Sequence, residues 1–163
     1  MNGLREYWDP RRRLSGIALA GISVVALLLI AVLATGCGSA EKSEIGITGV
    51  KVIPGNKMLH KGETTIIQVK KNLGFVVGVK NTGNAAGKNI KVTLLIDQKP
   101  AAIKKTLTIG QIDSGQTTQM VFKAPFYVTE MISVLPIKVG VTPRTGETNK
   151  ANNKAIYEVR FSF

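Results

Sequence analysis

Residues 90–97 read Ile90-Lys91-Val92-Thr93-Leu94-Leu95-Ile96-Asp97, and every second side chain from the first onward is aliphatic. Side chains that alternate with a period of two lie on opposite faces of a strand, whereas a helix requires a period near 3.6. The stretch therefore predicts a β-strand that is buried on one face, and its acidic last residue indicates a turn.

The same period recurs from Ile45 to the end of the chain, with clusters of Gly, Asn, Pro and Asp between short apolar runs. Further strands are predicted at residues 45–52, 64–69, 75–80, 104–109, 117–123, 131–142 and 155–163. Seven or eight short strands without a convincing helical pattern predict an all-β domain, an immunoglobulin-like antiparallel β-sandwich. A small barrel is the alternative architecture. Pro136 cannot donate to a strand ladder, so it is expected at an edge or a bulge.

One hydrophobic helix is predicted before this domain. Residues 14–36 carry no charged side chain, and a helix of that length extends about 34 Å, enough to cross a bilayer core of about 30 Å. Arg5, Arg11, Arg12 and Arg13 precede the apolar run, which predicts a short cytoplasmic tail and an extracytoplasmic position for everything after Cys37.

The apolar run ends in Leu33-Ala34-Thr35-Gly36-Cys37, which resembles a bacterial lipobox, although Ala34 stands where Leu is more usual. Cys37 is therefore a candidate for lipidation, and residues 38–44 are predicted to be a short tether. The alternative is an uncleaved transmembrane helix in which the cysteine has no role. Either alternative predicts that residues 1–37 attach the protein to the cell membrane.

Charge and composition exclude several classes of function. The chain has 163 residues and a net charge of +12, and residues 38–163 hold 18 Lys and Arg against 8 Asp and Glu. The lysines are spread along the domain without interleaved aromatic platforms, so nucleic acid is not an expected partner. A single Cys excludes an intramolecular disulfide, and a single Cys and a single His (His60) exclude His- or Cys-based metal centres. No catalytic constellation is found, and neither an enzymatic activity nor a cofactor is predicted.

Three segments form a pattern of strand ends and turns. Residues 77–83 (Val-Gly-Val-Lys-Asn-Thr-Gly) contain an apolar strand that ends in an Asn-x-Gly turn, residues 92–97 form the following strand, and residues 146–153 (Gly-Glu-Thr-Asn-Lys-Ala-Asn-Asn) contain a Glu-x-Asn-x-x-Asn-Asn loop before the last strand. In this order and spacing, the three segments resemble the cell-adhesion-related domain found in bacteria (CARDB). The resemblance covers residues 45–163 and implies an immunoglobulin-like sandwich with an adhesive or accessory binding role on a surface protein. It implies no particular ligand.

The sequence departs from the family pattern at three positions. Lys150 stands where the family commonly has an acid, Thr142 where an Asp often precedes the Pro, and Gln98 where Gly is usual. Loss of two acids makes a calcium site in the loop less favourable.

The loop with Glu147, Asn149, Asn152 and Asn153 has two interpretations. Asn side chains mimic backbone turns, so the preferred one is a structural loop that fastens the last strand. The other is a site for a hard cation, since Glu and Asn oxygens are suitable ligands. One carboxylate between Lys150 and Lys154 disfavours the cation, and no metal is predicted.

The sequence as a whole predicts a membrane-anchored extracytoplasmic module of the cell envelope that binds a protein or an envelope polymer. A purely structural spacer or subunit of an envelope assembly is the alternative. Association of the lysine-rich surface with a polyanion or with lipid headgroups is a further one.

Overall fold

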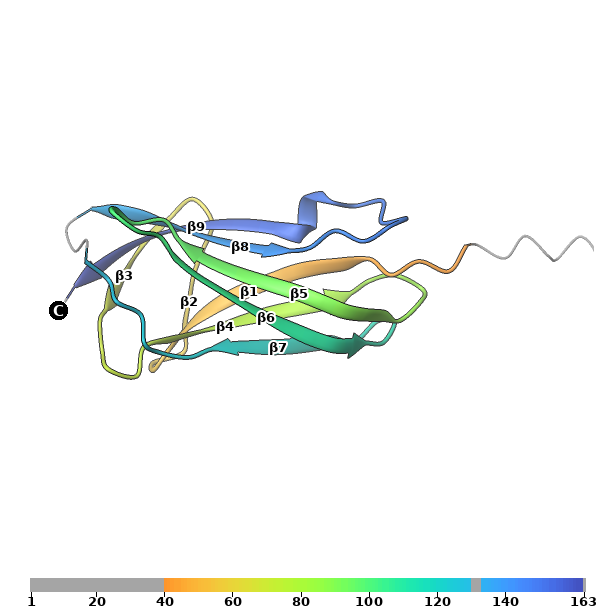
Figure 1. The fold of residues 1–163 in the computed structure, drawn as a ribbon, viewed down its shortest axis with the longest axis horizontal. Helices are drawn as coiled ribbons and strands as arrows, with labels where there is room; N and C mark the ends of the chain where they lie inside the picture. The colour runs from red at the N-terminus through yellow and green to blue at the C-terminus, as the bar shows by residue number, and fades with distance from the viewer. Residues whose placement is uncertain (1–39, 130–132, 163) are drawn as a thin grey trace, which may run out of the picture. The chain divides into compact units, whose positions relative to one another are not determined.

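The computed structural model describes residues 40–129 and 133–162, in which two β-sheets pack face to face (Figure 1). The predicted hydrophobic helix and Cys37 lie outside the described residues. Within the described ranges, no helix is both long enough and apolar enough to span a membrane. Residues Glu41–Phe163 form one compact unit, so Lys42–Glu44, predicted as part of a tether, belong to it by their contacts.

The first sheet has four strands in the order β2-β1-β4-β7, and all its neighbouring strands are antiparallel. Its members are β1 (Ile45–Ile53), β2 (Lys57–Met58), β4 (Gly74–Asn81) and β7 (Thr117–Phe122). A register shift between Ile47 and Gly49 makes a β-bulge in β1. Such a bulge leaves one residue of the bulged strand unpaired.

The second sheet has five strands in the order β3-β9-β8-β5-β6. Its members are β3 (Thr64–Gln68), β5 (Gly87–Ile96), β6 (Ile103–Ile112), β8 (Val134–Val141) and β9 (Lys154–Ser162). The alternating stretch at residues 90–97 supplies most of β5, which lies between β8 and β6. A short 3-10 helix, η2 (Ala151–Asn153), leads into β9.

The predicted all-β sandwich is confirmed, with two corrections. The described chain contains nine strands instead of seven or eight, because the two-residue β2 carries too few side chains to show a period. The sheet is not wholly antiparallel, since β3 pairs with β9 in parallel. The β-branched pattern of β3 predicts a strand, but with one Ile on each side it does not predict which face is buried, which neighbour the strand joins or in which direction.

Pro136 was expected at an edge or a bulge, but it lies in β8, which has a neighbour on each side. Pairing of β8 with β5 stops at Ile137, one residue away, and the Pro136 carbonyl accepts a hydrogen bond from the N–H of Asp97 just beyond the end of β5. In a strand the N–H and C=O of one residue point to the same side. An N–H at Pro136 would therefore point toward Asp97, beyond the last paired residue of β5. For this reason the β5–β8 ladder loses no hydrogen bond to the proline.

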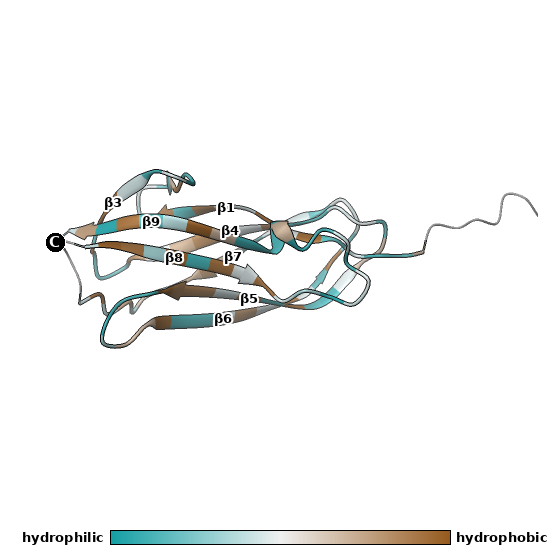
Figure 2. Ribbon diagram, turned by 90° about the horizontal axis from the view of Figure 1, so that it is seen from above, coloured by the Kyte–Doolittle hydropathy of each residue, from teal (hydrophilic) through white to brown (hydrophobic). Residues whose placement is uncertain are grey.

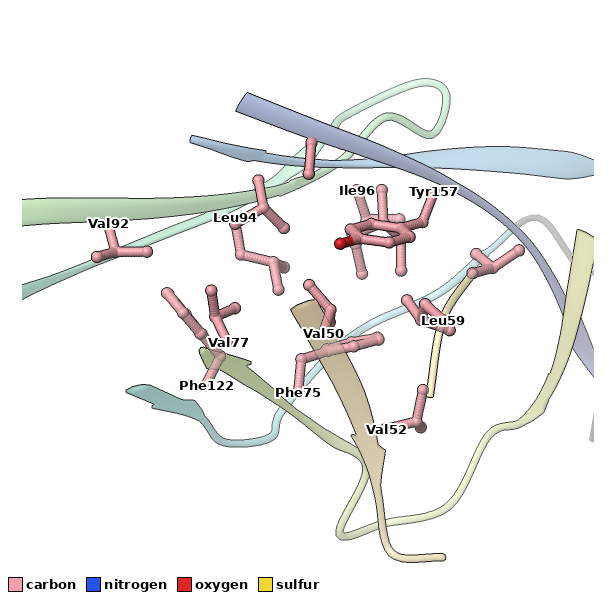
Figure 3. Packing of buried hydrophobic residues seen from close by; sticks show 14 of the residues in the cluster. Val50, Val52, Leu59, Phe75, Val77, Val92, Leu94, Ile96, Phe122 and Tyr157 are labelled. Atoms are coloured by element: carbon pink, nitrogen blue, oxygen red, sulfur yellow. The ribbon is translucent and has the colours of Figure 1, made fainter. Parts of the chain in front are cut away.

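The core fills the space between the sheets (Figure 3). Side chains from the first sheet face those of the second, and these include Val50, Phe75, Val77 and Phe122 on one side and Val92, Leu94, Ile96 and Tyr157 on the other. Alternating hydropathy along β8 and β9 is visible in Figure 2 and matches the alternation of buried and exposed residues in both strands. Burial of one face of each sheet is the main stabilising contribution to such a sandwich.

The two ends of the sandwich are different (Figure 1). At one end, which we call the entry end, β1 begins beside the β4–β5, β6–β7 and β8–β9 connections. At the opposite end, which we call the tip, β9 ends near the β3–β4 and β5–β6 connections and the segment after β7. The ten-residue strand β5 runs between the two, so they are separated by about 30 Å.

Candidate functional site

The segment before β1 is bound to the connection between β4 and β5. The carbonyl of Glu44 accepts a hydrogen bond of 2.8 Å from the N–H of Thr82, and the carbonyl of Lys42 accepts one of 3.1 Å from the N–H of Ala85. A Cβ atom at Gly83 would overlap the carbonyl oxygen of Lys42, so only glycine permits this close approach. The chain therefore enters the domain along a fixed path.

Asn81, at the end of β4, is fully buried and joins three segments of the entry end. Its amide nitrogen donates to the carbonyls of Ala85 and Ile112, at 2.7 and 3.0 Å. Its amide oxygen accepts from the N–H groups of Glu44 and Gly83, at 3.1 and 3.0 Å. A buried polar side chain is tolerated when it is paired in this way, and Asn81 thus holds the entering segment against both neighbouring connections.

Glu147 lies in the loop before β9, and its carboxylate is buried, with 5% of the residue exposed. One oxygen accepts a 2.7 Å hydrogen bond from the N–H of Ile45, the first residue of β1. The other accepts from the Asn153 amide at 2.7 Å and from the N–H of Arg144 at 3.0 Å. Hydrogen bonds to a charged acceptor are roughly twice as strong as those between neutral groups, so Glu147 fastens the start of β1 to the last loop.

Glu44, which directly precedes β1, makes the reciprocal contact to the same loop. Its carboxylate accepts bonds from the Thr148 hydroxyl at 2.5 Å, the Thr148 N–H at 2.7 Å and the Asn149 N–H at 3.1 Å. The Thr148 hydroxyl, together with these two N–H groups, lowers the pKa of the Glu44 carboxyl from its ordinary value. We call the set of Glu44, Asn81, Glu147 and Asn153 the entry clasp.

The four loop residues predicted from the sequence have different roles in the structure. Glu147 and Asn153 meet in the entry clasp, whereas Asn149 contributes a backbone N–H and its side chain is exposed. The Asn152 side chain lies against Gly46, where a Cβ atom would come within 2.7 Å of the amide nitrogen. The side-chain oxygens of Asn152 and Asn153 are buried and have no hydrogen-bond partner in the described part of the chain.

Two members of the entry clasp were missed by the sequence reasoning. Asn81 was treated only as the end of a strand, and Glu44 as part of a tether. The Asn-x-Gly pattern at residues 81–83 was a usable signal for Asn81, because a turn asparagine commonly bonds the backbone two residues on. No local pattern marks Glu44, whose partners are more than 100 residues away.

Comparison with known proteins gives a family and a fold. The CARDB family model matches residues 60–156. No curated protein matches the chain significantly. The CARDB domain of the PF1109 protein from Pyrococcus furiosus, solved in complex with di-metal ions, has a TM-score of 0.53 and 18% identity, over 74% of this chain and 89% of that one. A domain of a Methanosarcina acetivorans protein described as a "putative cell surface protein" has a TM-score of 0.50 and 21% identity, over 73% and 93% of the two chains.

At these identities the solved structures show the fold alone. The family match is more informative, because it spans more than half of the chain and includes β3 to β8. It also contains Asn81 and the loop with Glu147 and Asn153, so three members of the entry clasp lie within it. The two-sheet topology and the matched residues lead to one assignment: the chain belongs to the CARDB family.

Proposed function

We propose that this protein is a membrane-anchored extracytoplasmic module that binds a component of the cell envelope. The observation that carries the proposal is the entry clasp, which ties the segment directly after the predicted anchor to the domain at one end. The clasp leaves the tip, at the opposite end of the domain, uncovered by this segment, and we assign the partner to the tip.

Chain length supports membrane attachment of the domain. Cys37 and Lys42 are five residues apart, and a fully extended chain of that length spans at most about 17 Å, so the domain follows the predicted anchor without a long linker. The cell-surface description of the Methanosarcina acetivorans domain supports an extracytoplasmic location.

The distribution of exposed apolar residues supports a polar partner or the alternative role as a spacer. Ile66 of β3 and Val134 of β8 are exposed, and both lie opposite Arg160 of β9. Exposed Ile156 lies opposite Lys138. Charged side chains therefore interrupt the apolar ones on the outer face of the five-stranded sheet. A larger continuous apolar patch would instead mark an apolar protein interface.

We propose no catalytic activity for the domain. Asp97 and Asp113 follow the ends of the antiparallel neighbours β5 and β6, which places the two carboxylates at opposite ends of the sheet. Asp97 is ion-paired with Lys138 at 2.6 Å, and Asp113 accepts a bond from Gln111. A pair of carboxylates for acid–base work needs to face one substrate bond.

The two-metal complex of the Pyrococcus furiosus domain raises the question of a similar site in this chain. The carboxylates of Glu44 and Glu147 each accept three hydrogen bonds from the chain itself. In the described ranges, no three His, Cys, Asp or Glu side chains come together as ligands. Calcium takes six to eight oxygens, so the amide oxygens of Asn152 and Asn153 do not suffice and the described residues of the loop do not fit a calcium ion.

Cysteine accessibility in intact cells tests the proposal. In a Cys37→Ser background, Thr108→Cys places a single thiol on the exposed face of β6. A membrane-impermeant maleimide should label it in intact cells, whereas Asn2→Cys in the N-terminal tail should react only after permeabilisation. The opposite result would overturn the extracytoplasmic location.

A further inference from the structure

The tip carries a groove of about 660 Å³ between the β3–β4 connection and the segment that follows β7. Lys70 and Lys71 line one side, and Pro125, Phe126 and Tyr127 line the other. We call this feature the tip groove. It combines the most exposed aromatic side chain of the described residues with a cluster of lysines, and nothing in the entry clasp or the core requires that combination.

The backbone beneath Tyr127 is held firmly. The ring of Phe126 packs edge-on against Phe75 of the core, with 5.1 Å between ring centroids. Gln98 is buried, its amide nitrogen donates to the Tyr127 carbonyl at 2.9 Å, and its oxygen accepts from the Thr129 N–H at 3.1 Å. A Gly at position 98, usual in the family pattern, has no side chain to make either bond.

The Tyr127 side chain projects from this fixed backbone and is 76% exposed. An exposed tyrosine loses little conformational entropy on binding, since it has only two side-chain torsions. Its ring offers a flat apolar face and a hydroxyl group. Such a side chain is suited to stacking on a flat or ring-shaped ligand group.

In the described part of the chain, the charged side chains that line or flank the groove are lysines. Lys70, Lys71 and Lys123 are exposed, and the Lys105 ammonium lies 4.3 Å from the centre of the Phe126 ring while it donates to the Lys123 carbonyl. Asp97, the acid at the end of β5, is already ion-paired with Lys138. The lysines of the groove therefore present a positive potential to a ligand.

We infer that the tip groove binds an anionic glycan, that is, a polymer of sugar rings that carry carboxylate or phosphate groups. Tyr127 stacks on a sugar ring, and Lys70, Lys71 and Lys123 pair with its anionic groups. The inference rests on the proposed function for the extracytoplasmic location of the groove.

Binding is tested with the full-length protein in detergent. Phosphomannan and oligogalacturonate are the phosphate and carboxylate probes, neutral mannan is the uncharged match of the first, and polyglutamate supplies charge without sugar rings. Both anionic glycans, or one of them, should bind, with affinity that falls as salt rises. Mannan and polyglutamate should bind at least tenfold more weakly.

Variants locate the site. Tyr127→Ala should weaken binding about tenfold or more, as for an aromatic side chain at a binding hot spot. Lys70→Gln with Lys71→Gln should weaken it similarly and flatten its salt dependence. Lys88→Gln with Lys91→Gln removes the same charge from exposed residues of β5 near the entry end and should change affinity less than threefold. An unchanged melting temperature checks that each variant is folded, and Tyr127→Trp should retain binding.

Three results would overturn the inference: equal weakening by the two lysine pairs, polyglutamate binding as tight as glycan binding, or no effect of Tyr127→Ala. Tip-dependent binding to phosphatidylglycerol vesicles with no glycan binding would assign the groove to a membrane surface instead. Maleimide labelling reports the location of the domain independently of glycan binding. If Thr108→Cys is labelled in intact cells but the protein binds neither anionic glycan, this inference is overturned and the proposed location stands.

Discussion

The carboxylate of Glu147 accepts a 2.7 Å hydrogen bond from the backbone N–H of Ile45, which lies 102 positions earlier in the chain. The bond joins the first residue of β1 to the loop before β9. In the opposite direction, Glu44 reaches Thr148 and Asn149 in the same loop. The two carboxylates together close the entry end of the sandwich.

Replacing Glu147 with Gln should destabilise the compact unit of residues 41–163. The glutamine keeps the shape but presents an N–H₂ group to one of three donors, so a buried donor loses its acceptor. The free energy of unfolding should fall by about 2–3 kcal/mol, measured by urea denaturation. Glu158→Gln, at an exposed position on β9, is the matched control and should change it by less than about 0.5 kcal/mol. Equal effects of the two variants would contradict the role of Glu147.

Glu44 should make stability depend on pH on the acid side. Its pKa is lower in the folded protein than in the unfolded chain, because the charged form accepts three hydrogen bonds, chiefly from Thr148. The stabilisation is therefore fully present above the unfolded-state pKa and is lost as the pH falls through the folded-state value. Urea midpoints measured from pH 7 to pH 2.5 should show this loss.

The Glu44 effect has an internal control in Thr148. Thr148→Val removes the hydroxyl donor and should diminish the acid-side loss in the wild-type background. In a Glu44→Gln background, where position 44 carries no carboxyl group, Thr148→Val should cause no further change in the pH profile. Independent, additive effects of the two substitutions on the profile would contradict the contact.

Asn81 and Asn149 should differ sharply in their sensitivity to substitution. Asn81→Ala removes four hydrogen bonds of a fully buried side chain and should cost more than about 3 kcal/mol of unfolding free energy. Asn149→Ala leaves its backbone N–H in place and should cost less than about 0.5 kcal/mol. The free energy of unfolding is measured by thermal or urea denaturation. Comparable losses for the two variants would contradict the greater importance that the hydrogen bonds give to Asn81, and would favour the sequence pattern, which singles out Asn149.

Two measurements on the loop before β9 distinguish its structural interpretation from its interpretation as a cation site. Replacing Asn152 and Asn153 with Ala should lower the melting temperature, because Asn153 donates to Glu147 and Asn152 packs on Gly46. Calcium should leave the wild-type melting temperature unchanged, since a ligand stabilises only by binding the native state. A melting temperature that rises with calcium and falls with a chelator would restore the cation site.

Cys37 should carry a lipid if the lipobox interpretation is correct. Metabolic labelling with an alkyne fatty acid should mark the wild-type protein, and Cys37→Ser should abolish the label. An unlabelled wild-type protein of full-length mass would indicate a plain transmembrane helix. The maleimide experiment on Thr108→Cys is independent of this outcome, because both anchors predict the same location.

Much of the fold follows from local patterns. The period of two in β9 predicts Tyr157, Val159 and Phe161 on one face, and all three are buried against the core. A period of this kind needs only neighbouring residues, because the alternation of side chains is a property of a single strand. The loop at residues 146–153 could be recognised for the same reason, since its asparagines and glutamate are close in sequence.

Tertiary structure alone decides which distant segments meet. The Glu44 carboxylate bonds Thr148 and Asn149, and Glu147 bonds the N–H of Ile45, each more than 100 residues away. The parallel pairing of β3 with β9 joins strands about 90 residues apart, and Gln98 reaches Tyr127 and Thr129 from another connection. A strand's pattern determines its buried face but leaves its neighbour and direction open. Those choices depend on how two sheets pack around one core, so the entry clasp and the tip groove exist only once the whole sandwich has formed.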